Sequence, residues 1–521
     1  MKNRKLTPLA AGLILGGLYR LYPSLYSGLP YSIDAWPLIR DMENLIKYTP
    51  IPMESSVFDG YNNYWPGVII FTSIYSMLLG LNPMETGGFI IPIINILPII
   101  LVYLILRRFR YGVSRSSYTA FLISILFPQA LFTSGLTKEG YAYPLYILIL
   151  YTLGIEGGAC GYLISILVAS TLVFTHHLTL FITSIVAAFI SIYLFIDYGF
   201  RRGLKGLYTF SILVLGGLIH YYLYGYKGFR IPELRIGMVI SFISYMIVFL
   251  FTSIYITHTG GGKGGGIRIL ASLALSMLLS YYVVALGYRE EMVRLPPHYM
   301  LYIAPYILLG SVSTGYLKHL KTVRERRFII FWFMSISAIL AYSIFGDNPI
   351  LVGIPYRIVD YLVIPLAILG LSILFEERFS GKAIAALLTI LVLSTSLYGL
   401  YSSFHSYDKY LGYNWRNRLG CLEAGYWVEA FNNDIRVSGD SIIKSIFHEY
   451  IGLGYTPGLK YFRGYDMEGN LVLVKYDLMD LNGYISGAYS YIEVDSSRLN
   501  YLSSMIYDSG IVSMYIGVEG G

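Results

Sequence analysis

Two pieces of one long loop decide the fold: Pro30-Tyr31-Ser32-Ile33-Asp34-Ala35-Trp36 and Phe58-Asp59-Gly60-Tyr61-Asn62-Asn63-Tyr64-Trp65-Pro66-Gly67. The loop follows the first hydrophobic segment and mixes carboxylates with aromatic residues. Polar groups next to a hydrocarbon layer are costly unless they serve a function. A carboxylate such as Asp34 among aromatic side chains suits a metal ion, a sugar or a proton. The alternative is a solvated loop whose acids cap the neighbouring helices.

The composition around this loop is that of a membrane protein. Of 521 residues, 55% are hydrophobic and 13% are charged, and the mean hydropathy is +0.59. Long uncharged apolar segments recur along the chain, which is typical of transmembrane helices. The two cysteines, Cys160 and Cys421, form no disulfide framework or metal motif. The strongest basic run, Lys318 to Arg327, is interpreted as a topology anchor, so no nucleic-acid partner is predicted.

The distribution of basic residues predicts the topology. The basic N-terminus indicates a cytoplasmic start, and the loop 23–88 then lies outside. We expect the apolar stretch 66–82 to lie along the membrane, because most later basic loops then fall inside. This choice gives about thirteen transmembrane helices within residues 1–401, one of them over 118–133. The segment 402–521 is predicted to be a small extracytoplasmic α/β domain.

Mixed patterning supports that α/β domain. Gly420–Phe431 and Ser441–Leu453 have helical periodicity, whereas 471–476, 489–494 and 511–518 have the composition of strands.

Two further outer positions carry polar residues. Lys138-Glu139 is either an interfacial ion pair or a functional pair facing Asp34. His176 and His177 cannot both point one way on a helix, and a satisfied interfacial histidine is the plain alternative. Together Asp34, Glu139 and His177 form an oxygen-rich set with one nitrogen, which favours Mn²⁺ or Mg²⁺.

Arginines in later outer loops offer charge for a phosphate. Arg294 and Arg357 can each grip a phosphate with two parallel hydrogen bonds, or contact lipid headgroups instead.

The quoted motifs resemble those of the GT-C superfamily of membrane glycosyltransferases. The resemblance rests on Asp34-Ala35-Trp36, on Asn63-Tyr64-Trp65-Pro66-Gly67, on the basic span end Arg107-Arg108-Phe109-Arg110 and on Glu139. Thirteen spans and an outer C-terminal domain are most similar to the archaeal oligosaccharyltransferase branch, and the abundance of tyrosine favours an archaeal source. The Trp-Trp-Asp-Tyr-Gly motif of that branch is missing, and the nearest stretch is Gly425-Tyr426-Trp427-Val428.

This resemblance implies an inverting glycosyltransferase of the cell membrane. A sugar would pass from a polyprenyl or dolichyl phosphate to a lipid or protein acceptor at the extracytoplasmic face. Asp34 and Glu139 would be the catalytic carboxylates, and Lys138, Arg294 and Arg357 would bind the donor phosphate. Trp36, Tyr64, Trp65 and His176 would line the substrate groove. The competing hypothesis is a flippase or another transporter, although such proteins favour internal repeats and charges near the bilayer midplane.

Overall fold

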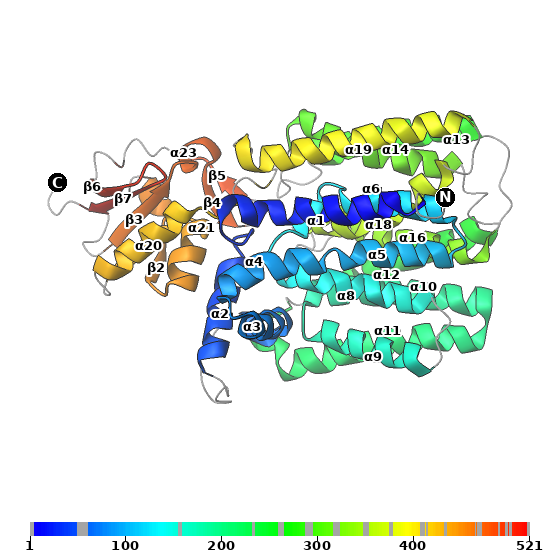
Figure 1. Cartoon of the computed structure of the whole chain (residues 1–521), viewed down its shortest axis with the longest axis horizontal. Coiled ribbons are helices and arrows are strands. Elements are labelled where there is room, and N and C mark those ends of the chain that lie inside the picture. Colours follow the sequence, from blue (N-terminus) through cyan, green and yellow to red (C-terminus); the bar gives the residue numbers. More distant parts are fainter. Residues whose placement is uncertain are drawn as a thin grey trace.

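The computed structural model is a long bundle of helices with a small sheet domain at one end (Figure 1). It describes residues 5–48, 61–154, 159–231, 235–258, 265–286, 295–315, 323–346, 354–374, 379–406, 412, 415–431, 435–463, 465, 471–487, 490–494, 499 and 503–517. The helices of the bundle are α1 Thr7–Ser27, α2 Ala35–Lys47, α3 Gly67–Leu79, α4 Pro83–Ile94, α5 Leu97–Arg108, α6 Val113–Ser124, α7 Gln129–Phe132, α8 Lys138–Gly154, α9 Ala159–Val173, α10 His177–Tyr198, α11 Phe200–Leu223, α12 Ile236–His258, α13 Gly265–Tyr281, α14 Met300–Gly315, α16 Arg327–Phe345, α18 Pro355–Leu374 and α19 Phe379–His405.

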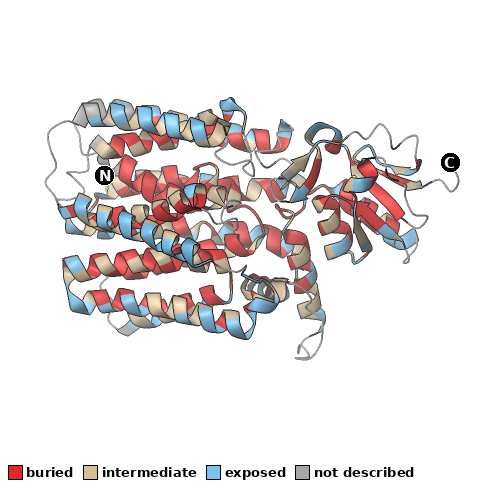
Figure 2. Cartoon of the chain, turned by 180° about the vertical axis from the view of Figure 1, so that it is seen from behind, coloured by how far each residue is buried: buried red, intermediate tan, exposed pale blue. Residues whose placement is uncertain are grey.

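The bundle confirms the predicted class of multi-pass membrane protein. Among the described residues, seven helices are long and apolar enough to cross a membrane. Two of these, Ile236–His258 and Arg268–Ala285, bury almost nothing inside the protein, which suits helices that face lipid. Figure 2 shows exposed residues along the outer sides of the long helices and buried ones between them. The number of crossings, about thirteen, and the orientation of the chain remain predictions.

The predicted continuous helix over 118–133 is wrong, because the chain breaks between α6 and α7. Pro128 has no backbone N–H, so it cannot donate to the preceding turn. The buried guanidinium of Arg20 satisfies polar groups around the break: it donates to Ser124 O at 2.7 Å, to Gln129 Oε1 at 3.2 Å and to Thr133 Oγ1 at 2.9 Å. The break therefore places residues 133–137 in a short loop ahead of α8.

Two helices of the long loop run across the bundle. Figure 1 shows α3 almost end-on and α2 perpendicular to the long helices. One face of α2 is buried, including Leu38, Ile39 and Met42. These side chains belong to the same hydrophobic cluster as the sheet domain, so α2 joins the bundle to that domain. That α3 lies along a membrane surface remains a prediction.

The C-terminal part is the predicted α/β unit. Its main sheet has the strand order β2-β1-β3-β7-β6, with β1 parallel to β2 and β3, and β7 antiparallel to β3 and β6. The elements are α20 Leu419–Phe431, β1 Arg436–Gly439, α21 Ser441–Ile443, a π-helical turn Lys444–Tyr450, β2 Gly454–Pro457, α22 Leu459–Phe462, β3 Leu471–Tyr476, α23 Met479–Asn482, β4 Tyr484–Gly487, β5 Ser490–Ile492, β6 Ser503–Asp508 and β7 Val512–Gly517. The three predicted strands correspond to β3, β5 and β7, whereas the pattern missed the others.

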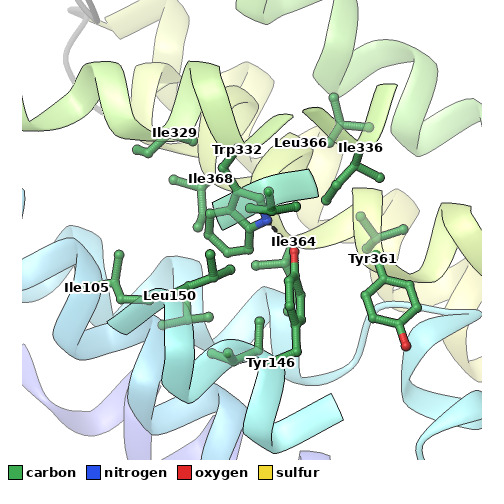
Figure 3. Close-up of a cluster of buried hydrophobic side chains, with 14 of the residues drawn as sticks. Ile105, Tyr146, Leu150, Ile329, Trp332, Ile336, Tyr361, Ile364, Leu366 and Ile368 are labelled. Carbon is green, nitrogen blue, oxygen red and sulfur yellow. Dashed lines mark hydrogen bonds between the residues drawn. The ribbon is translucent and has the colours of Figure 1, made fainter. Parts of the chain in front are cut away.

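The core of the bundle surrounds Trp332 of α16 (Figure 3). Its indole N–H donates to the hydroxyl of Tyr146 on α8, and Ile364 of α18 packs alongside. Figure 3 shows Tyr361 at the edge of this cluster, with its hydroxyl directed away from the aliphatic side chains. The core thus fixes α8 and α18 and leaves one hydroxyl for a polar site.

Candidate functional site

Backbone hydrogen bonds bring the first and second polar loops together. The N–H of Leu136 donates to Tyr31 O at 3.0 Å. From the other side, the amide of Asn417 donates to Pro30 O at 2.6 Å and to Ser32 O at 3.0 Å. Buried backbone groups need such partners. The segment that carries Asp34 is therefore held between the loop ahead of α8 and the chain that leads into the sheet domain.

The start of α8 is fixed in the same way. Thr137 Oγ1 accepts from the N–H of Gly140 at 2.8 Å, which caps the first turn. The amide of Asn95, at the bend between α4 and α5, donates to Gly140 O at 3.0 Å. Lys138 and Glu139 are consequently placed on a rigid turn.

The two loops close the polar end of a large cavity of about 1550 Å³. Its charged lining consists of Asp34, Arg40, Asp41, Lys138, Glu139, Arg357, Asp360 and Glu449. Its apolar lining comes from the long helices and includes Leu279, Val283, Tyr302, Ile344 and Leu366. The volume exceeds the roughly 300–1,000 Å³ of ordinary small-molecule pockets. A ligand with a charged head and a long apolar tail fits such a lining.

Asp34 lies at the N-cap position of α2, yet its side chain makes no capping hydrogen bond. It is exposed, but toward the cavity, where protein surrounds it. Burial raises the pKa of Asp34 above its ordinary value, and the positive charges of Arg357 and Lys138 partly oppose that rise. The observation weighs against the capping alternative for this residue.

Glu139 is buried and engaged on both oxygens. Oε1 accepts from the hydroxyl of Tyr361 at 3.0 Å, and Oε2 lies 3.5 Å from Nη1 of Arg357. The Tyr361 hydroxyl lies 2.6 Å from Thr179 Oγ1, which in turn lies 2.8 Å from Nδ1 of His176. A chain of hydrogen bonds thus orients the carboxylate from α18 and α10.

Lys138 points into the cavity without a hydrogen bond. Its side chain is 7% exposed, and Nζ has no hydrogen-bond partner among the described residues. The ammonium lies 3.3 Å from the centre of the Tyr61 ring, a cation–π contact. Burial lowers the pKa of Lys138 to about 7, and the charges of Asp34 and Asp41 oppose the shift. Lys138 is the first residue of α8, and its unpartnered ammonium in the cavity can receive a bound anion.

The predicted metal set of Asp34, Glu139 and His177 does not form. No group of three or more His, Cys, Asp or Glu within the described ranges could hold a metal ion. Nδ1 of His177 lies 2.9 Å from the Tyr61 hydroxyl, and its ring stacks on Phe229. Glu139 already faces a guanidinium, which would repel a cation. These residues therefore do not fit Mn²⁺ or Mg²⁺, and no step is derived through a metal.

The predicted groove residues have different positions. His176 lines the cavity, whereas Trp36, Tyr64 and Trp65 are not among its lining residues. The indole of Trp36 donates to Asn417 Oδ1 at 2.9 Å and is fully buried, so it fastens α2 to the sheet domain. The ring of Trp65 packs against those of Tyr61, His177 and His220. Arg294, a predicted phosphate ligand, lies outside the described residues, as does the stretch 49–60 with Asp59.

The sequence analysis assigned no role to three further residues of the site, although Asp360 stands out as a charged residue of the same loop as Arg357. Asp360 lines the cavity, is 4% exposed, and its Oδ1 has no hydrogen-bond partner in the described part of the chain. It follows Arg357 by one helical turn, which was the available signal. Tyr361 and Thr179 could not be recognised as site residues from the sequence, because tyrosine and threonine also occur inside apolar helices without a functional role.

The crossing helices, the C-terminal sheet domain and the amphipathic cavity define a class: the chain has a GT-C-like membrane fold. The solved structures that share it include the oligosaccharyltransferase of Archaeoglobus fulgidus in complex with Zn and sulfate. The TM-score is 0.51 and the identity 14%, over 97% of this chain and 73% of that one.

Other comparisons are more distant. ArnT from Cupriavidus metallidurans bound to undecaprenyl phosphate gives a TM-score of 0.42 and 11% identity, over 98% of both chains. The apo form gives 0.42 and 12%, over 98% of this chain and 97% of that one. No protein-family model matches the chain, and no curated protein does.

Proposed function

We propose that the protein is a glycosyltransferase of the cell membrane that transfers a sugar from a polyprenyl- or dolichyl-phosphate donor to a lipid or protein acceptor. One observation carries the proposal: an apolar cavity of about 1550 Å³ ends in a carboxylate, Asp34, beside the cationic groups of Lys138 and Arg357. An isoprenoid tail matches the apolar lining, and a phosphate matches the two cations. The GT-C-like fold supports the same class.

The chemistry follows from these charges. The acceptor oxygen attacks the anomeric carbon, the bond from that carbon to the phosphate oxygen breaks, and the bonding electrons leave with the phosphate. Asp34 receives the acceptor proton or orients the acceptor hydroxyl. Arg357 and Lys138 stabilise the charge that develops on the leaving phosphate. Attack from the face opposite the phosphate would give inversion, and the reaction would take place at the extracytoplasmic end of the bundle.

The raised pKa of Asp34 sets an expected pH dependence. Asp34 must be ionised to accept a proton, so activity should fall as the pH drops through this raised pKa, above the ordinary range of an aspartate.

The test uses purified protein, radiolabelled polyprenyl-phosphate sugars and a membrane extract as acceptor. We expect donor consumption by the wild type, a loss of about 10²- to 10⁴-fold in Asp34→Asn, and no change in Glu85→Gln. Glu85 is an exposed acid on α4 that does not line the cavity. Equal turnover by Asp34→Asn and the wild type would remove Asp34 from the site. No turnover by any variant, together with lipid-linked sugar crossing vesicles, would replace the transferase with a flippase.

A further inference from the structure

Two positive side chains, Lys138 and Arg357, line the same cavity as the carboxylates of the predicted metal set. Asp34, Asp41 and Lys138 line the same end of the cavity, and the Lys138 ammonium has no hydrogen-bond partner among the described residues. Nη1 of Arg357 lies 3.5 Å from Oε2 of Glu139, and Arg357 lines the cavity together with Asp34. Each carboxylate of the predicted metal set is thus matched by a cation of the chain itself. A divalent ion at the same place would face an ammonium and a guanidinium at close range, which is repulsive.

We propose that the Lys138 ammonium takes the place of a divalent cation in this site and that the protein binds its phosphate ligand without a metal. The inference rests on the proposed function, because it names the group that binds the donor phosphate.

The surroundings of Lys138 hold the ammonium in position. Its backbone begins α8, whose first turn is capped by Thr137 and fastened by Asn95. The Tyr61 ring lies 3.3 Å from Nζ and Trp65 lies 6.0 Å away, so aromatic faces support the charge on one side. Within the described residues no acceptor receives a hydrogen bond from Nζ. Three N–H donors therefore remain for an anion in the cavity.

Lys138 and Arg357 approach the cavity from different helices. Arg357 belongs to α18 and its guanidinium lies beside the Glu139 carboxylate. Lys138 belongs to the first turn of α8, and its Nζ makes no hydrogen bond with the described residues. A phosphate between them would receive donors from two elements. The ammonium of Lys138 is a compact charge on a flexible side chain, so it can follow the donor phosphate as that phosphate gains negative charge when its bond to the sugar breaks.

The first experiment measures binding and needs no turnover. Farnesyl phosphate is titrated into purified protein in nanodiscs, with EDTA and separately with Mn²⁺. We expect the wild type to bind equally in both, Lys138→Met to bind roughly 10- to 100-fold more weakly, and Lys138→Arg to recover most of the affinity. Wild-type binding that requires Mn²⁺ would overturn the proposal. So would wild-type affinity in Lys138→Met, which keeps most of the bulk of the side chain but removes its charge and its N–H donors.

The second experiment introduces the missing ligand. Lys138→Asp places a third carboxylate next to Asp34 and Glu139, and Mn²⁺ binding is followed by the loss of the free-ion electron paramagnetic resonance signal. We expect one bound Mn²⁺ in Lys138→Asp that is lost when Asp34→Asn is added, and none at this site in the wild type. A wild-type Mn²⁺ site that disappears in Asp34→Asn would refute the inference. If farnesyl phosphate fails to bind the wild type under every condition, the phosphate site of the proposed function fails, and the Mn²⁺ measurement still decides whether Lys138 occupies a metal position.

Discussion

Glu139 competes with a bound phosphate for Arg357, and this competition predicts a gain of affinity from a mutation in the site. Nη1 of Arg357 lies 3.5 Å from Oε2 of Glu139, and the two side chains are 28% and 4% exposed. At this distance the attraction between unit charges is about 5 kcal/mol for an effective dielectric constant of 20. The net value after desolvation is closer to 2 kcal/mol, as for other hydrogen bonds to charged groups.

We therefore expect Glu139→Gln to bind farnesyl phosphate roughly 30-fold more tightly, since 1.4 kcal/mol corresponds to about tenfold. Glutamine keeps an oxygen for the Tyr361 hydroxyl, so the packing of α18 stays intact. Arg357→Ala should weaken binding by a similar factor. Isothermal titration calorimetry at pH 8 measures both, with Glu85→Gln as the control that changes nothing near the cavity.

The sign of the first effect is the decisive point. If Glu139→Gln weakens binding as Arg357→Ala does, the carboxylate positions the guanidinium for the phosphate and does not compete with it. That result would refute the electrostatic reasoning while leaving the phosphate site in place. If neither variant changes the affinity, the phosphate does not approach Arg357.

Two further predictions concern stability. Burial raises the pKa of Asp440 to about 6 from an unperturbed 3.8, so the folded state binds more protons than the unfolded state between these values. The free energy of unfolding therefore falls by up to about 3 kcal/mol as the pH rises from 4 to 6. Limited proteolysis of the C-terminal part at different pH values should show this slope in the wild type and no slope in Asp440→Asn. Gly67→Ala should destabilise the contact of α3 with the start of α10 by about 1–3 kcal/mol, because a Cβ there would lie 2.5 Å from Thr175 Oγ1. In Gly112→Ala the Cβ meets nothing within 4 Å, so a thermal shift equal to that of Gly67→Ala would contradict the steric argument.

Site residues could be predicted best where a charged side chain stands at the end of an apolar segment. Asp34, Lys138, Glu139 and Arg357 are charged residues at the ends of apolar segments, and such residues are rare enough to be noticed singly. All four line one cavity. The fold class could be predicted for the same reason, because long apolar helices leave a strong signal in one dimension.

Aromatic residues of the loop were harder to place. Trp36 and Trp65 were assigned to a substrate groove, but both are buried in packing contacts outside the cavity. Tryptophan serves cores, interfaces and ligand sites equally well, so its identity does not decide between them. Its contacts with residues about four hundred positions further along, a hydrogen bond to Asn417 and a ring contact with Tyr450, show that Trp36 fastens α2 to the sheet domain.

The metal assignment failed for a reason that bears on the chemistry. Residue types alone describe a possible ligand set, whereas the affinity of that set depends on which charges surround it. Glu139 faces the guanidinium of Arg357, and Asp34 lines the same cavity as Lys138 and Arg357. The positions of these cations depend on the packing of α8 against α18. An internal ammonium needs no equilibrium with a free metal ion, although with a pKa of about 7 Lys138 carries its full charge only below that pH. It also cannot supply the vacant coordination positions with which a metal binds two oxygens at once. A site built in this way should therefore discriminate its phosphate ligand by the shape of the cavity and the placement of donors. The conservative change Lys138→Arg, which keeps the charge and alters only the geometry of the donors, measures how much of the recognition depends on that placement.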